Sequence, residues 1–279
     1  MKKLILKILP PLYGQYFNMV SLFNQKKAAK SAFNLFCTIR KGRVNEKQKP
    51  FLDKAKSSIE EAAGHHIQVY RWRGSAETVL LVHGWESNSF RWRNLIQKLR
   101  ESDFNILAFD APGHGYSSGN QLYVPLYSEC LQVMIEKYRP KYLVGHSAGG
   151  MTLLYNDFKH QNPEIDKMVT IGSPSEFEEI MAHYQSLLGF NKRVMRSLDD
   201  YIFNRFNMYI ADFSSSKFVT SNTKKGLLFH DRLDAIAPYH ASQKVHRDWK
   251  DSQLITTEGL GHSMHQEEVN HQIVDFLKA

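Results

Sequence analysis

At 279 residues, 42% of them hydrophobic, the chain is long enough to bury one large core. No apolar run approaches the roughly 18 to 20 residues that cross a bilayer, and two cysteines, Cys37 and Cys130, are too few for a disulfide framework. We therefore expect a cytoplasmic protein without a membrane-spanning segment or a secretory signal.

The formal net charge of +8 originates in the N-terminal part of the chain. Residues 1–60 hold 13 Lys and Arg against 3 Asp and Glu, and the other 219 residues hold 23 against 25. No aromatic or groove-reading arrangement downstream accompanies this charge, so we expect no nucleic-acid partner. The opening segment combines apolar and basic residues, namely Leu4, Ile5, Ile8 and Leu9 with Lys2, Lys3 and Lys7. Such a segment either packs on its own domain or makes a weak contact with an anionic membrane surface. Composition leaves the oligomeric state unknown.

Helical patterns dominate the first 63 residues, which we predict to form a basic helical arm. Residues 25–40 place alanine, leucine and phenylalanine on one broad face and end in basic residues before Gly42, as is typical of a helix C-terminus. A second helical stretch is predicted from about Glu46 to Ala63.

From Ile67 the pattern changes to short strand-like runs separated by amphipathic helices. This alternation predicts an α/β fold, in which helices flank both faces of a mostly parallel sheet, over residues 64–279. The interval from Ser175 to Thr223 is too long for a simple connection, so we predict a helical cap insertion there. Its many large apolar side chains either line an apolar pocket or hold the cap together. The predicted strands are Ile67–Trp72, Thr78–His83, Ile106–Asp110, Tyr142–His146, Met168–Gly172, Gly226–His230 and Gln253–Thr257.

The segment Gly145-His146-Ser147-Ala148-Gly149 follows an apolar strand and precedes a helical run. A serine in a sharp strand-to-helix turn needs very small neighbours, because a Cβ at Gly145 or Gly149 would clash. The order of strand, G-x-S-x-G and helix is that of a nucleophile elbow. It predicts Ser147 as a nucleophile.

Three further segments, together with this turn, resemble the α/β-hydrolase fold family from about Ile67 to the C-terminus. They are the strand and His-Gly turn of 80–85, the D-x-P-G-x-G-x-S loop of 109–117 and the G-x-G-H turn of 259–262. The resemblance implies a serine hydrolase whose oxyanion hole uses the backbone N–H groups of Trp85 and Ala148. It also implies structural or pocket-shaping roles for His83 and His114. Trp85, which either walls the acyl pocket or packs on the domain, and His146 are further pocket candidates. Neither a cofactor nor a metal ion is expected, since the pair His262 and His265 matches no zinc spacing.

A serine hydroxyl needs a positioned imidazole to take its proton. His262 is the best candidate among 13 histidines, because it follows the last predicted strand in a Gly-flanked loop before a terminal helix. The family order of serine, acid and histidine leaves Asp231 and Asp234 as competing acids. Asp234 is favoured because residues 234–238 resemble the family's D-x-x-V-P ending, whereas Asp231 suits a turn.

These residues predict cleavage of an ester or related acyl bond through an acyl-Ser147 intermediate. A carboxylesterase acting on a small apolar substrate is the leading interpretation. A thioesterase, lipase, peptidase or acyltransferase would use the same triad. A non-catalytic ligand-binding or sensing protein of the same fold is the alternative of a different class.

Overall fold

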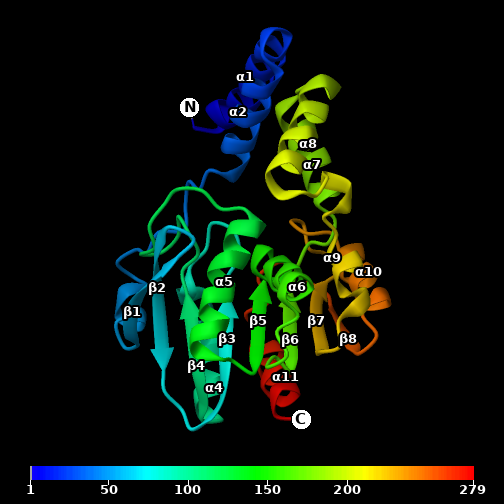
Figure 1. Cartoon of the computed structure of the whole chain (residues 1–279). Helices are drawn as coiled ribbons and strands as arrows, with labels where there is room; N and C mark the ends of the chain where they lie inside the picture. Colours follow the sequence, from blue (N-terminus) through cyan, green and yellow to red (C-terminus); the bar gives the residue numbers. More distant parts are fainter. Residues whose placement is uncertain (1) are drawn as a thin grey trace. The chain divides into compact units, whose positions relative to one another are not determined.

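The computed structural model describes residues 2–279, and side chains from Leu9 onward. The chain forms two compact units (Figure 1). A helical unit combines residues up to Thr38 with Glu176–Ser214, and an α/β unit combines Ile39–Ser175 with Ser215–Ala279. Among the described residues, no helix combines the length and the apolarity that crossing a membrane requires.

One eight-stranded sheet, ordered β1-β2-β4-β3-β5-β6-β7-β8, forms the centre of the α/β unit (Figure 1). β2 pairs antiparallel with both β1 and β4, and all pairs from β4 to β8 are parallel. This confirms the predicted α/β fold and all seven predicted strands, with small shifts at their ends. The strands are β1 Lys56–Ala62, β2 His65–Trp72, β3 Ala76–Val82, β4 Phe104–Phe109, β5 Tyr142–His146, β6 Lys167–Ile171, β7 Lys225–Asp231 and β8 Ser252–Thr257.

Two hydrophobic clusters cover the two faces of this sheet. Alternate residues of β3 show the division, because Leu80 and Val82 belong to one cluster whereas Val79 and Leu81 belong to the other. Helices α5, α6 and α10 supply apolar residues to the first cluster, and α4 and α11 supply them to the second. The helices are α4 Arg93–Glu101, α5 Val124–Tyr138, α6 Ala148–His160, α10 His240–Asp248 and α11 Glu267–Lys278, with short turns at η1 Ser89–Trp92, α3 Lys49–Leu52, α9 Ser215–Phe218 and η3 Val219–Ser221.

The predicted helix from Glu46 to Ala63 is wrong. Only α3 is helical there, and β1 pairs along its whole length with β2. Both Ala63 and Gly64 have positive φ, which closes a tight hairpin between the two strands. β1 is an edge strand with mostly exposed side chains, so it lacks the alternation of polar and apolar residues that would have identified it. The helical arm predicted over residues 1–63 is therefore helical only as far as Cys37, apart from α3.

The N-terminal helices pack with the helices of the predicted cap insertion. α1 contacts α2 and α7, and α2 contacts α8. Phe33 packs against Tyr201 and Phe206, and Phe36 packs against Phe177 and Tyr184. These aromatic residues of the insertion thus stabilise the helical unit itself. The helices are α1 Lys2–Phe23, α2 Gln25–Cys37, α7 Phe177–Leu188 and α8 Lys192–Phe206, with a short turn η2 at Ile210–Asp212.

Candidate active site

Ser147 occupies the turn between β5 and α6 with φ 53° and ψ −122°, a conformation that L-residues rarely adopt. Its N–H donates to the Ile171 carbonyl at 2.9 Å, so β6 supports the turn. A Cβ at Gly149 would lie 2.2 Å from the Val82 carbonyl oxygen, and one at Gly145 would lie 2.7 Å from the Gly150 nitrogen. The two glycines are therefore required by close backbone packing, as the sequence indicated.

The His-Gly turn after β3 lies directly against this elbow. A Cβ at Gly84 would come within 2.9 Å of the Ser147 Cβ and 3.0 Å of the His146 carbonyl oxygen. The peptide that follows Gly84, which carries the Trp85 N–H, therefore starts beside the serine turn. Ala148 is the first residue of α6, so its N–H belongs to the group that a helix start leaves without an intrahelical acceptor. The oxyanion-hole role of these two N–H groups stays a prediction.

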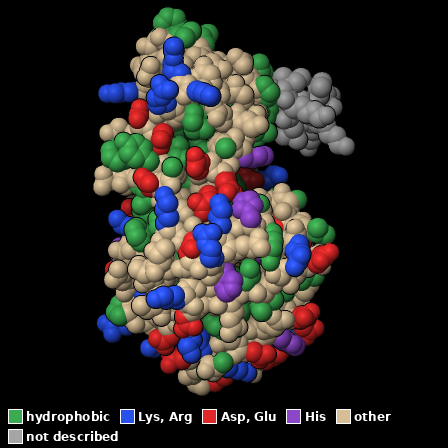
Figure 2. Space-filling view, turned by 90° about the vertical axis from the view of Figure 1, so that its right-hand side faces the viewer, with side chains coloured by type: hydrophobic (Ala, Val, Ile, Leu, Met, Phe, Trp, Pro, Cys, Tyr) green, Lys and Arg blue, Asp and Glu red, His purple; other side chains and the backbone are tan. Residues whose placement is uncertain are grey.

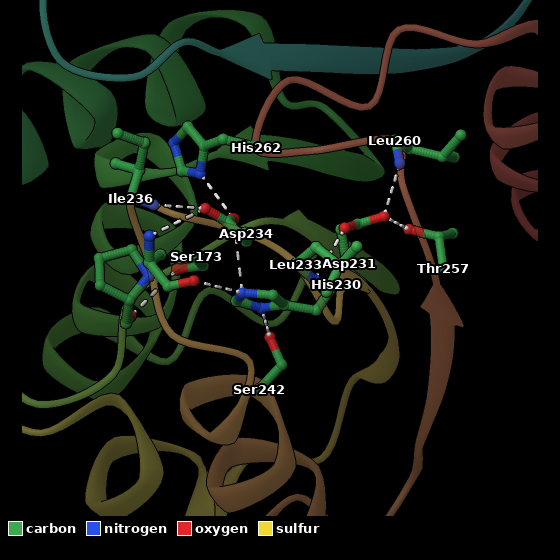
Figure 3. A network of polar contacts seen from close by, with 12 residues as sticks. Ser173, His230, Asp231, Leu233, Asp234, Ile236, Ser242, Thr257, Leu260 and His262 are labelled. Atoms are coloured by element: carbon green, nitrogen blue, oxygen red, sulfur yellow. Dashed lines mark hydrogen bonds and ion pairs between the residues drawn. The ribbon is translucent and has the colours of Figure 1, made fainter.

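His262 and Asp234 are joined by a hydrogen bond of 2.7 Å between Nδ1 and Oδ2 (Figure 3). The second carboxylate oxygen of Asp234 accepts the backbone N–H groups of Ile236 at 2.8 Å and Ala237 at 3.0 Å. Burial acts to raise the pKa of Asp234, but the bond from His262 and the two backbone bonds outweigh it and lower this pKa. A carboxylate at Asp234 holds the proton of His262 on Nδ1, which leaves Nε2 with a free lone pair.

Asp231, the competing acid, points to a different part of the same loops (Figure 3). Its carboxylate accepts the Thr257 hydroxyl at 2.8 Å and the backbone N–H groups of Leu260 at 2.8 Å and Leu233 at 2.9 Å. Although burial acts to raise its pKa, these bonds lower it. Asp231 therefore ties the end of β7 to the loop that carries His262, whereas Asp234 contacts His262 itself.

His146, the residue before the serine, braces the loop of His262. Its Nε2–H donates to the His262 carbonyl at 2.9 Å, and the two rings lie 4.8 Å apart. Burial, with help from Arg91 and His262, keeps the pKa of His146 well below its usual value. A neutral His146 with its proton on Nε2 fits this bond, and it brings the His262 loop alongside the elbow.

Arg91 is a contributor that the sequence analysis missed. Its guanidinium is buried, lies 4.6 Å from the ring centroid of Trp92 and donates to the Ser263 carbonyl at 2.9 Å. Burial, together with the charge of Arg93, lowers the pKa of Arg91 to about 9. An arginine in the short turn after the His-Gly segment carries no motif, so only the tertiary structure reveals that it anchors the residue after His262.

His83 and Trp85, both predicted near the pocket, differ in how deeply they are buried. His83 is fully buried, donates from Nδ1 to the Gly84 carbonyl at 2.8 Å and accepts the Ala111 N–H on Nε2 at 2.9 Å. Burial lowers the pKa of His83 to about 4, so His83 is a neutral structural link between two loops. Trp85 is partly buried and packs on the core. Its ring centroid lies 6.4 Å from that of His114.

The loop after β4 secures the same region through a buried carboxylate. Asp110 accepts the Ser89 N–H at 2.9 Å, the Tyr70 hydroxyl at 3.0 Å and the Tyr116 N–H at 3.0 Å. A Cβ at Gly115 would lie 1.8 Å from Asp110 Oδ2, which explains the glycine at that place in the loop. In the part of the chain that the structure describes, no three His, Cys, Asp or Glu side chains come together in a way that could hold a metal ion.

Family models, sequence relatives and solved structures with the same fold match this chain. A family model described as "alpha/beta hydrolase fold" matches residues 77–213, and one described as "TAP-like protein" matches residues 212–279. An esterase of Mycobacterium tuberculosis is 37% identical over 103 residues, which span 34% of this chain and only 33% of that esterase. An uncharacterized hydrolase of Bacillus subtilis is 24% identical over 72% of this chain and 90% of its own length. Among solved structures, an esterase from Exiguobacterium antarcticum superposes with a TM-score of 0.65 at 17% identity, over 80% of this chain and 100% of its own.

Proposed function

Because the chain belongs to the α/β-hydrolase fold family, we propose that it is a serine hydrolase that cleaves ester or related acyl bonds through an acyl-Ser147 intermediate. The observation that carries this proposal is the Asp234–His262 hydrogen bond of 2.7 Å, formed in a loop that His146 holds beside the strained Ser147 turn. These contacts support a triad in which Ser147 is the nucleophile, His262 the base and Asp234 the acid.

In the first step, His262 Nε2 takes the proton of the Ser147 hydroxyl while Oγ bonds to the substrate carbonyl carbon. The carbonyl oxygen becomes an oxyanion, for which the N–H groups of Trp85 and Ala148 are the proposed donors. His262 is then an imidazolium, and the Asp234 carboxylate stabilises its charge. When the tetrahedral intermediate collapses, the ester C–O bond breaks and the alcohol leaves with the proton from Nε2.

In the second step, a water molecule gives its proton to His262 Nε2 and its oxygen attacks the acyl carbon. Collapse of the second intermediate breaks the bond to Ser147 Oγ, which recovers the proton, and a carboxylic acid is released. Water balances the reaction, so the cycle requires no cofactor.

A small carboxylic ester is the substrate class we propose. Two observations support it: relatives of this chain are named esterases, and so is a solved structure of this fold.

The test is labelling with a fluorophosphonate probe, combined with hydrolysis of p-nitrophenyl acetate, butyrate and octanoate. We expect labelling of the wild type, loss of labelling in Ser147→Ala and His262→Ala, and retention in the matched controls Ser58→Ala and His271→Ala. These controls remove an exposed serine and a half-exposed histidine elsewhere in the chain. A folded wild type that neither reacts with the probe nor hydrolyses any ester would overturn the proposal in favour of a binding protein.

A further inference from the structure

Helix α1 buries one narrow side and leaves most of its large apolar side chains exposed. Gly14, Phe17 and Ser21 face the neighbouring helices, and a Cβ at Gly14 would lie 1.8 Å from the Leu188 carbonyl oxygen of α7. Phe17 packs edge-on against Phe190. The contacts of α1 with its own unit are thus made by one narrow side.

The opposite side of α1 exposes large apolar side chains along its length. Leu12, Tyr16, Met19 and Phe23 recur at spacings of three and four residues, so they lie on one face of the helix. We call these four residues, with Leu9 and Leu22, the outer face of α1. Their exposed fractions are 44% for Leu9, 59% for Leu12, 42% for Tyr16, 58% for Met19, 63% for Leu22 and 88% for Phe23. An ordinary surface helix shows the reverse arrangement, with polar residues outward.

Positive charge surrounds this outer face in the sequence. Residues 1–38, the first segment of the helical unit, contain six lysines and no Asp or Glu. Lys26, Lys27 and Lys30 of α2 are exposed, and the acidic residues of the helical unit are confined to its second segment, residues 176–212. Figure 2 shows one face of the molecule, on which green hydrophobic side chains lie among blue basic and red acidic ones.

We propose that the outer face of α1 binds the surface of an anionic phospholipid membrane. Leucine, methionine and phenylalanine side chains would enter the boundary between headgroups and acyl chains, where tyrosine is also favoured. The exposed lysines of α2, Lys26, Lys27 and Lys30, would attract the negative lipid headgroups. A second copy of this chain fits less well, because pairing the outer faces would bring two acid-free basic segments together. Of the opening residues, Leu4, Ile5 and Ile8 have side chains outside the described part, and the proposal rests on Leu9 and those after it. The membrane proposal does not depend on the proposed serine-hydrolase activity.

Co-sedimentation of the full chain with vesicles tests the proposal. We expect binding to vesicles of phosphatidylcholine with phosphatidylserine, little binding to phosphatidylcholine alone, and weakening as salt rises. Met19→Gln with Phe23→Gln should lower the partition coefficient by at least about tenfold, since each apolar side chain contributes through its buried area. Lys26→Gln, Lys27→Gln and Lys30→Gln together should lower it by up to about fivefold per lysine.

Matched controls separate this face from the rest of the surface. Ile59→Gln changes an equally exposed apolar residue in the α/β unit, and Lys47→Gln with Lys54→Gln changes exposed lysines there. These variants should bind as the wild type does, and circular dichroism should show equal helix content in all variants. Absence of binding to anionic vesicles at low salt would overturn the proposal, as would equal binding by Met19→Gln with Phe23→Gln. A concentration-dependent dimer that this pair abolishes, without vesicle binding, would assign the face to a second copy instead.

Discussion

The loops around Ser147 and the outer face of α1 differ in how their side chains are paired and exposed. In the loops, His262 pairs with Asp234 through its ring and with His146 through its carbonyl, and Ser147 holds a strained backbone conformation. On α1, apolar side chains remain exposed, and no residue of positions 2–23 has a positive φ. Catalysis requires atoms fixed to within a fraction of an ångström, whereas attachment to a fluid surface requires only one face of the right chemistry. The following substitutions test this contrast, from the largest expected effect to the smallest.

Replacement of the nucleophile should have the largest effect. Ser147→Ala removes the oxygen that forms the acyl intermediate, so kcat/KM for p-nitrophenyl butyrate should fall by at least about 10⁴-fold. Thermal unfolding followed by circular dichroism should change little, because the elbow glycines are retained. Activity within tenfold of the wild type would rule out Ser147 as nucleophile.

Kinetic measurements should distinguish the two competing acids, Asp234 and Asp231. Asp234→Asn loses the carboxylate that orients His262 and should lower kcat by up to about 10⁴-fold, as loss of the triad acid does elsewhere. The measurement is kcat across the pH range at saturating ester. If Asp231→Asn proved the more damaging of the two substitutions to kcat, the assignment of Asp234 would be wrong.

Arg91 should affect the reaction rate by holding the loop of His262 in position. Arg91→Met leaves the Ser263 carbonyl without its donor and should lower kcat/KM by about 10- to 100-fold, because a shift of about 1 Å in His262 is enough for this. Its matched control is Arg93→Met two residues away, whose guanidinium lies over the Phe90 ring, 4.8 Å from its centroid. Rates that fall equally in both variants would show a general loss of packing instead.

Asp231→Asn should act on stability. The variant keeps the side-chain shape but loses charge-assisted acceptance of the Thr257 and Leu260 donors, at a cost of about 1 to 3 kcal/mol in unfolding free energy at pH 7. Because folding lowers the pKa of Asp231, this contribution is present above the ordinary carboxyl pKa and disappears as pH falls through the lowered one. Urea titrations from neutral to acidic pH should therefore show the two proteins converging in stability. A constant difference at every pH would contradict the role of the charge.

Substitution on the outer face of α1 should have the smallest effect on the stability and activity of the isolated protein. Met19→Gln should change the unfolding free energy by less than about 0.5 kcal/mol and leave ester hydrolysis in solution unchanged, because its side chain is exposed. By contrast, Phe17→Ala on the buried side of the same helix should cost about 3 to 5 kcal/mol in the helical unit. Equal losses from the two substitutions, measured by thermal unfolding, would show that Met19 is packed in solution.

Sequence alone determined the features that depend on local pattern. The α/β alternation predicted the sheet, because buried parallel strands are short continuous apolar runs. The glycines around Ser147 and the Gly-flanked His262 marked the loops, because a strained or tight turn restricts which residues it accepts. The same rules failed for β1, whose exposed edge carries no alternation and which forms only by pairing with β2.

Tertiary structure alone decided which groups meet. Asp231 and Asp234 are three residues apart and chemically identical, and only the path of the loop after β7 directs one to His262 and the other to Thr257. Arg91 and His146 acquire their contacts to Ser263 and His262 across more than a hundred residues of chain. The pairing of α1 and α2 with α7 and α8 is likewise non-local, and it determines which side of α1 is buried and which remains exposed. Periodicity specifies that a helix has two faces, but only its packing partners select between them.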